Sequence, residues 1–315
     1  MSDEGTLIYT SGMTLARTLV WVDRRGQEEP LGAPVRQYRY PRLSPDGRRV
    51  ALDLLDASDR DIWIWDLQRR VLERFTVDPA GNPLAAWTLD GSRLAFGSDR
   101  FGPTNLFWQM ANGSGPPERL LESARIQMPL TFAPDGRLLF SEEVPGEGRN
   151  IQALNLETRR TESVIRTPAN ELNAEISPDG RWIAYDSNES GQLEIYVRAY
   201  PDTRTGGRWQ ISSGGGRQPL WSRDGRELYF RAFSGAVMGT RVTLAPTFSS
   251  SAVTTLLDGT GYAGSGRFAS ARTFDVASDG RFLMIKLLSG DAETTPSLVV
   301  VQNWFEELKR LGPSR

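Results

Sequence analysis

Three charged residues, Arg42, Glu175 and Asp275, occupy the same position of a repeated motif, four residues before the aspartate of an Asp-Gly pair. Other copies of the motif have Ala86, Thr131 and Leu220 at this position. A guanidinium group fixes a carboxylate or phosphate through charged hydrogen bonds, and carboxylates hold an ammonium group or a cation. If the repeats surround a common axis, these residues predict a small-ligand or peptide-terminus site with Arg42 as its anion anchor. The alternative interpretation is a solvated lining that binds only water and ions.

A second position, six residues before the same aspartate, also carries polar side chains. Residues two apart in a strand point to the same face, so this position should face the same way as the charged one. We therefore expect a candidate ligand-binding set made of Arg42, Glu175, Asp275, Tyr40, Asn173, Gln218 and Thr273. The residues three before each aspartate are all apolar and are expected to pack in the core: Leu43, Trp87, Phe132, Ile176, Trp221 and Val276.

The composition argues against most kinds of catalysis. The chain of 315 residues has no His and no Cys, which removes Ser-His-Asp triads, thiol nucleophiles and most transition-metal sites. It has no phosphate-binding loop and no Gly-x-Ser-x-Gly motif, and the glycine-rich stretch 261–267 is interpreted as a surface loop. The Asp-Gly turns lack the Asp-x-Asp-x-Asp ladder of calcium loops, and the acidic stretch 56–61 is typical of an exposed hairpin. We expect no catalytic residue, no metal and no cofactor.

The Asp-Gly pair recurs along the whole chain. Copies such as "SPDGRRVAL", "TLDGSRLAF" and "SPDGRWIAY" place the aspartate at Asp46, Asp90, Asp135, Asp179, Asp224 and Asp279. A regular spacing of about 44 residues is typical of propeller blades or helical arrays. Pro, Asp and Gly at consecutive positions predict a tight turn, and alternating runs such as "RWIAYD" predict strands beside it. With the aromatic run "DIWIWDL" and a fourth polar run, each repeat holds four strands, which predicts an all-β fold, the β-propeller.

The chain ends decide the number of blades. The first blade would have strands at "TLIYTS", "TLVWVDR" and "EEPLGAP" but no inner strand, and the last would have "ARTFDVA", "RFLMIKLL" and "SLVVVQN". We therefore expect one domain over 1–315 with seven blades, of which the terminal ones are incomplete, in a chain that continues upstream of Met1. Six blades with rearranged terminal strands is the alternative. "NWFEELKRL" predicts a short C-terminal helix over 303–311, capped by Asn303.

Charge and hydropathy limit the partners. A net charge of −2 with mixed signs gives no basic stripe, so we expect no nucleic-acid partner. No apolar run is long enough to span a membrane, and we expect no membrane contact within this chain. The N-terminus lacks the pattern of a signal peptide, which indicates a cytoplasmic protein unless the chain is the tail of a membrane-anchored one.

The repeated "SPDGRxxAY/F" followed by "DIWIWDL" or "EIYVRAY" resembles the TolB-like family of β-propeller repeats. The longer motifs "RTLVWVDRRGQEEPL", "NAEISPDGRWIAYDSNESGQLEIYVRAYPD" and "NWFEELKRL" are similar to the propeller region that follows the kinase domain of bacterial eukaryotic-like serine/threonine kinases. Similar propellers precede the hydrolase domain of prolyl oligopeptidases. Neither the kinase motifs nor a hydrolase domain is present in this sequence. The resemblance implies a propeller with a sensing or docking role.

Three classes of function follow from these observations. The leading hypothesis is a non-catalytic binding or scaffold module, the detached or truncated propeller of a receptor-like kinase, with a protein, peptide or small-molecule ligand at the channel mouth. The second is a calcium-dependent propeller hydrolase using Glu175, Asn173 and Asp275. The third is a TolB-like assembly partner in the cell envelope.

Overall fold

The computed structural model describes residues 7–10, 16–56, 59–264, 271–288 and 298–301. The chain divides into two compact units, which are described separately: residues 17–287, and residues 1–16 together with 288–315. In the second unit, β1 (Leu7–Thr10) pairs antiparallel with β27 (Leu298–Val301) in a two-stranded sheet. The prediction of one domain over 1–315 remains a prediction. No helix in the described segments is long and apolar enough to cross a membrane.

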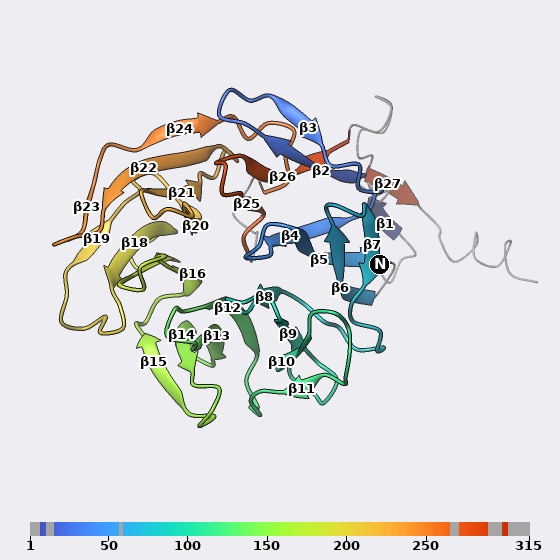
Figure 1. Ribbon diagram of the computed structural model, residues 1–315, viewed down its shortest axis with the longest axis horizontal. Coiled ribbons are helices and arrows are strands. Elements are labelled where there is room, and N and C mark those ends of the chain that lie inside the picture. Colours follow the sequence, from blue (N-terminus) through green and yellow to red (C-terminus); the bar gives the residue numbers. More distant parts are fainter. Residues whose placement is uncertain (1–6, 11–15, 57–58, 265–270, 289–297, 302–315) are drawn as a thin grey trace, which may run out of the picture. The chain divides into compact units, whose positions relative to one another are not determined.

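Residues 17–287 form six antiparallel sheets, the blades, arranged around a central channel (Figure 1). Blade 1 consists of β4 (Tyr38–Leu43), β5 (Arg49–Asp56), β6 (Asp59–Asp66) and β7 (Val71–Arg74). Blade 2 consists of β8 (Ala85–Trp87), β9 (Arg93–Ser98), β10 (Asn105–Met110) and β11 (Glu118–Arg119). Blade 3 consists of β12 (Gln127–Phe132), β13 (Leu138–Val144), β14 (Gly148–Leu154) and β15 (Thr161–Ile165).

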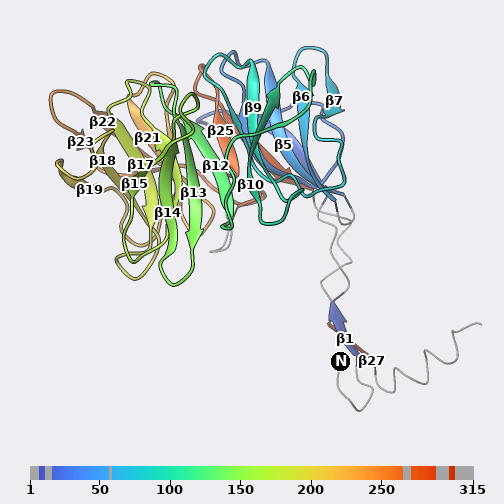
Figure 2. The same ribbon diagram turned by 90° about the horizontal axis from the view of Figure 1, so that it is seen from below.

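The other three blades complete the ring. Blade 4 consists of β16 (Glu171–Ile176), β17 (Trp182–Ser187), β18 (Glu194–Ala199) and β19 (Arg208–Gln210). Blade 5 consists of β20 (Arg217–Trp221), β21 (Glu227–Arg231), β22 (Val237–Thr243), β23 (Ser249–Ser250) and β24 (Thr254–Leu257). Blade 6 consists of β25 (Phe274–Val276), β26 (Phe282–Leu287), β2 (Arg17–Val22) and β3 (Glu28–Pro30). Figure 2 shows that the strands run between the two faces of the ring.

The prediction of seven blades with incomplete terminal blades is wrong, because the two sets of terminal strands share one blade. β26 pairs antiparallel with β2, with Leu19 opposite Ile285, so the C-terminal side of the chain supplies the two inner strands of blade 6 and the N-terminal side supplies the two outer strands. This pairing satisfies backbone groups that two incomplete blades would leave exposed at their edges. The helix predicted over 303–311 lies outside the described residues.

The prediction that the Asp-Gly pairs form turns is confirmed. In the first turn, Gly47 has φ +70° and its N–H donates to the carbonyl of Ser44 at 2.9 Å. The carboxylate of Asp46 accepts hydrogen bonds from the Ser44 hydroxyl at 2.5 Å and from the Arg48 N–H at 3.0 Å. Because these contacts lie within five consecutive residues, the motif itself dictates the hairpin between the inner strand and the next one.

The core lies between neighbouring blades. The apolar residues three before each aspartate are buried: Leu43, Trp87, Phe132, Ile176, Trp221 and Val276. Two of them also hold the backbone of the preceding blade. The indole N–H of Trp87 donates to the Arg42 carbonyl at 2.9 Å, and that of Trp221 donates to the Glu175 carbonyl at 3.2 Å.

A β-bulge interrupts the inner strands and changes which side chains face the channel. The register with the next strand shifts between Arg39 and Arg42, and equivalent shifts occur in β12, β16 and β20. Residues six before the aspartate have positive φ in four blades: Tyr40, Leu84, Asn173 and Gln218. An extra residue reverses the alternation of side chains on either side of it. The strict period of two expected for this strand therefore does not hold.

Candidate functional site

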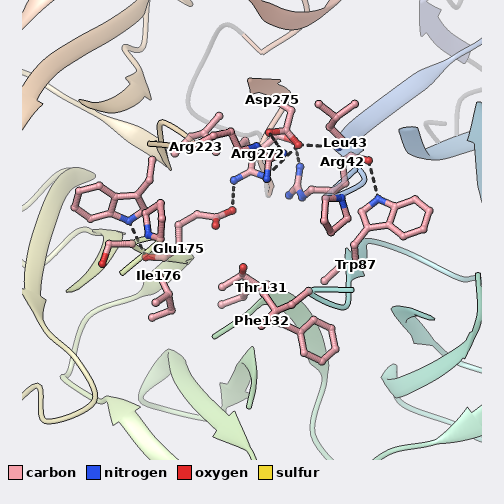
Figure 3. A pocket seen from close by; sticks show the side chains of 18 of the residues that line it. Arg42, Leu43, Trp87, Thr131, Phe132, Glu175, Ile176, Arg223, Arg272 and Asp275 are labelled. Carbon is pink, nitrogen blue, oxygen red and sulfur yellow. Dashed lines mark hydrogen bonds and ion pairs between the residues drawn. The ribbon is translucent and has the colours of Figure 1, made fainter. Parts of the chain in front are cut away.

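A cavity of about 280 Å³ opens on the face of the ring that carries the Asp-Gly turns. The structure brings Arg42, Glu175 and Asp275 together in its wall, from blades 1, 4 and 6 (Figure 3). Thr131, Ala86 and Leu220 occupy the equivalent places in the other blades and also line it. Ala86 and Thr131 form the wall on the side of blades 2 and 3, and the charged side chains lie on the remaining side, where Leu220 of blade 5 stands between Glu175 and Asp275.

Arg272, which the sequence did not single out, joins the two carboxylates. Its Nη1 donates to Glu175 Oε1, and its Nη2 lies 3.5 Å from Asp275 Oδ2. The Arg272 side chain is only 7% exposed, so these interactions lie in a medium where charges attract more strongly than in water. Arg272 stands just before β25, outside the repeated motif, and no spacing in the sequence marks it.

Asp275 is held as a buried anion. Its Oδ2 accepts the N–H of Leu43 at 2.8 Å and its Oδ1 accepts the N–H of Val276 at 2.8 Å. Burial alone would raise the pKa of Asp275, but the charges of Arg272 and Arg223 outweigh it and keep that pKa below its usual range. Asp275 therefore ties blade 6 to the inner strand of blade 1.

The pKa of Glu175 is shifted in the opposite direction from that of Asp275, although burial and neighbouring arginines act on both carboxylates. Burial raises the pKa of Glu175 above its usual range, although the charges of Arg272 and Arg42 act in the opposite direction. Its contact with Arg272 crosses the channel from blade 4 to blade 6. The two carboxylates and Arg272 form one network, which we call the charged layer.

Arg42 is the member of this site without a carboxylate partner. Its Nη1 donates to the carbonyls of Pro41 and Arg272, each at 2.9 Å, and within the described residues no carboxylate lies in ion-pair range of it. Its buried Nε has no hydrogen-bond partner there. Burial, together with the charge of Arg272, lowers the pKa of Arg42 to about 9, although Asp275 and Glu175 act in the opposite direction from beyond ion-pair distance, so Arg42 is still a cation at neutral pH. Arg42 therefore presents a positive charge to the cavity.

The residues six before the aspartate lie elsewhere. Asn173 donates to Asp186 Oδ2 at 3.1 Å and lines a second cavity of only about 10 Å³, on the other side of the charged layer. The amide oxygen of Gln218 accepts hydrogen bonds from the N–H and the hydroxyl of Thr273, at 3.1 and 3.0 Å. The ring of Tyr40 lies beneath the Arg60 guanidinium group, 5.6 Å away. The structure thus separates Tyr40, Gln218 and Thr273 from both cavities that Arg42 lines, whereas Asn173 lies with Arg42 and Glu175 in the smaller one.

The rim of the cavity comes from the second residue of each turn. Pro45, Leu89, Pro134 and Pro178 make it apolar, and Leu89 is 51% exposed. Blade 5 has Arg223 at this position, whose Nη2 lies 3.9 Å from Asp275 Oδ1. The sequence did contain a sign that Arg223 is unusual, because its turn reads "SRDG" where the motif has "SPDG".

The charged layer does not suit a calcium ion. Calcium takes six to eight oxygen ligands, but Glu175 and Asp275 already interact with the cation Arg272, and Asn173 donates to Asp186. No cluster of three or more potential metal ligands occurs among the described residues. The residues that could hold a ligand are therefore Arg42 and Arg223, which favour an anion.

The comparisons with known proteins agree with this architecture. No protein-family model matches the chain. The Tol-Pal system protein TolB of Helicobacter pylori is 26% identical over 146 residues, which are 45% of this chain and 35% of that protein. A solved structure assigned to TolB from Agrobacterium tumefaciens has a TM-score of 0.71 at 16% identity and covers 88% of this chain and 100% of that one. The chain thus has the β-propeller fold of this solved structure, and part of its sequence is similar to TolB.

The chain spans about a third of the length of the curated relative that it matches, and the structural similarity at 16% identity shows the fold alone. The same fold also carries catalysis, since an oligogalacturonate lyase in complex with manganese has a TM-score of 0.52 at 10% identity, covering 92% of this chain and 99% of that one. The link to a kinase-associated propeller is not shown by these comparisons and remains a prediction from the sequence.

Proposed function

We propose that this TolB-like propeller is a non-catalytic protein-binding module that receives an extended peptide segment in the cavity, with a carboxylate of the peptide on Arg42. The observation that carries this proposal is the unpaired positive charge of Arg42 in the cavity wall. Arg42 is partly buried and makes no direct ion pair within the described residues, so a ligand carboxylate would add charge-assisted hydrogen bonds that the protein itself does not supply.

The apolar rim supports a peptide over a small inorganic ligand. Pro45, Leu89, Pro134 and Pro178 surround the opening, where apolar side chains of a peptide would be removed from water. Arg223 lies on the same rim and adds a second cation. A peptide with an acidic or C-terminal carboxylate and flanking apolar residues fits this combination.

Among the three classes of function, an assembly partner of the TolB type is favoured, because the sequence relative is the TolB protein of the Tol-Pal system. A calcium-dependent hydrolase is disfavoured by the placement of Arg272 between the carboxylates. The tail of a receptor-like kinase would use the same cavity, and only the identity of its partner would differ.

The test is selection of peptide ligands with free C-terminal carboxylates from a random library, followed by calorimetry on the selected peptides. Arg42→Met should weaken their binding by about tenfold to a hundredfold, the effect expected for one charged hydrogen-bonded group. Amidation of the peptide carboxylate should weaken binding to the parent protein similarly and should add little in Arg42→Met.

Arg226→Met is the matched control, because the Arg226 side chain is 85% exposed on a turn of the same ring. It should bind the peptides like the parent. A library without ligands at millimolar concentration, or peptides whose binding is insensitive to Arg42→Met, would contradict the proposal.

A further inference from the structure

Two other buried arginines face each other in blade 5. Arg217 on β20 and Arg231 on β21 are directly opposite residues of an antiparallel pair, and both side chains are 0% exposed. Opposite residues of such a pair have Cβ atoms about 5 Å apart, and like charges at that position repel each other. Neither arginine lines the cavity that contains Arg42.

Their hydrogen bonds leave most of each guanidinium group unused. Nη2 of Arg217 donates to the Gly264 carbonyl, and Nη2 of Arg231 donates to the Ala263 carbonyl at 3.1 Å. The Nε and Nη1 atoms of both arginines are buried and have no partner within the described part of the chain. The buried amide nitrogen of Gln218, the next residue after Arg217, is also without a partner there.

No carboxylate of the described residues balances these two charges directly. Asp186 acts on Arg217 from beyond ion-pair distance, and its Oδ2 accepts a hydrogen bond from Asn173. The ring of Phe274 lies 5.9 Å from the Arg231 guanidinium carbon and contributes only a weak attraction. Burial lowers the pKa of both arginines, that of Arg231 to about 10, so Arg231 is a cation at neutral pH. Arg217 is a cation as well, because a guanidinium group keeps its proton in proteins.

A buried pair of like charges needs a counter-charge to be stable. We propose that Arg217 and Arg231, with the amide of Gln218, bind a small inorganic anion between blades 5 and 6. Both arginines already donate to residues 263 and 264, which precede blade 6 in the chain, so the anion would fasten blade 5 to the blade that closes the ring. This site is separate from the peptide cavity and does not depend on the proposed function.

The experiment measures the thermal midpoint of unfolding in gluconate buffer, into which chloride, phosphate or sulfate is titrated at constant ionic strength. Binding to the folded state alone produces a midpoint that rises and then saturates. We expect saturation in the parent protein and in the control Arg226→Met. Arg231→Met and Arg217→Met should require at least about tenfold more anion for the same rise. The anion that saturates at the lowest concentration identifies the preferred chemistry.

Salts that are excluded from the protein surface, such as sulfate and phosphate, also stabilise proteins. This stabilisation does not saturate and is equal in all variants. A rise of that kind, equal in the parent, Arg226→Met and Arg231→Met, would overturn the proposal. A second measurement covers the case in which both arginine variants fail to fold. Crystals of the parent grown with the anion that saturates at the lowest concentration, with bromide in place of chloride, should show density for that anion within hydrogen-bonding distance of both guanidinium groups, and the absence of that density would equally overturn it.

Discussion

Arg272 and Arg231 are both buried arginines of the propeller, but their surroundings differ. Arg272 interacts with two carboxylates, Glu175 and Asp275, that come from different blades. Arg231 faces another arginine and, among the described residues, donates only to a backbone carbonyl. Burial alone therefore does not reveal the role of an arginine in this ring. An arginine with carboxylate partners connects blades, whereas one without them is available to bind an anion.

Arg42 lies between these two cases. It borders the charged layer, yet it donates only to carbonyl groups and has no carboxylate of its own among the described residues. The layer thus combines a self-contained network, Arg272 with its two carboxylates, and one cation that is available to a partner. The predictions below test this division.

The largest effect is expected when the paired arginine is removed. Arg272→Met leaves Glu175 and Asp275 without their shared cation, and breaking a buried ion pair in this way costs about 3–5 kcal/mol. Urea unfolding should show this loss, whereas Arg231→Met in anion-free buffer should be as stable as the parent or more stable. The double variant Arg272→Met with Glu175→Gln should recover part of the loss. Equal losses in Arg272→Met and Arg231→Met would remove the distinction between the two arginines.

A smaller effect on stability is expected from Asp186, the carboxylate whose charge acts on Arg217. Burial raises the pKa of Asp186 to about 6, so the folded protein binds a proton there that the unfolded chain has already released. Because the folded pKa is raised, this contribution is complete below about pH 4 and is lost as the pH rises through 6. The shift corresponds to roughly 3 kcal/mol at most.

The measurement is the free energy of unfolding between pH 4 and 7 for the parent and Asp186→Asn. Asp186→Asn should remove part of the fall in stability with rising pH. Glu171, whose pKa burial raises to about 7, contributes a fall in the same direction, so the difference between the two proteins is the quantity to compare. Parallel curves would show that Asp186 is ionised throughout this range.

The local features of this fold were predictable from the sequence, because they depend on neighbouring residues. The turn around Asp46 is made by contacts within five residues, and the alternating runs after each turn form the second strands. The number of blades was not predictable in this way. It depends on whether β2 pairs with β26, more than 260 residues away in the chain, and no local pattern encodes that choice.

The candidate site was predictable in part for the same reason. The repeat placed Arg42, Glu175 and Asp275 at one position, and the structure brings them into one cavity. The bulge moved Gln218 away from that cavity, since a single residue in the left-handed conformation breaks a period of two. Thr273, in a blade without a recorded bulge, is hydrogen-bonded to Gln218 instead. Arg272 was missed because it lies outside the repeat, and Arg223 was missed although its turn departs from the motif.

The smallest effect on stability is expected from restoring that motif, Arg223→Pro. Pro occupies the same turn position in three other blades, at Pro45, Pro134 and Pro178, and the Arg223 N–H donates no backbone hydrogen bond among those identified. Proline at a compatible turn position stabilises a protein by about 0.4–1 kcal/mol. The half-exposed Arg223 side chain loses its ion pair with Asp275, at 3.9 Å, and the hydrogen bond from its Nε to the Val276 carbonyl, at 3.2 Å; together these contacts are worth about 1 kcal/mol, so the gain and the loss nearly cancel. Urea unfolding should therefore give the parent's stability to within about 1 kcal/mol.

The affinity of Arg223→Pro for carboxylate peptides should fall, because a cation leaves the rim while the charged layer stays intact. A large loss of stability would instead assign Arg223 to the network that holds Asp275, and would move it from the ligand-binding side of the comparison to the structural one.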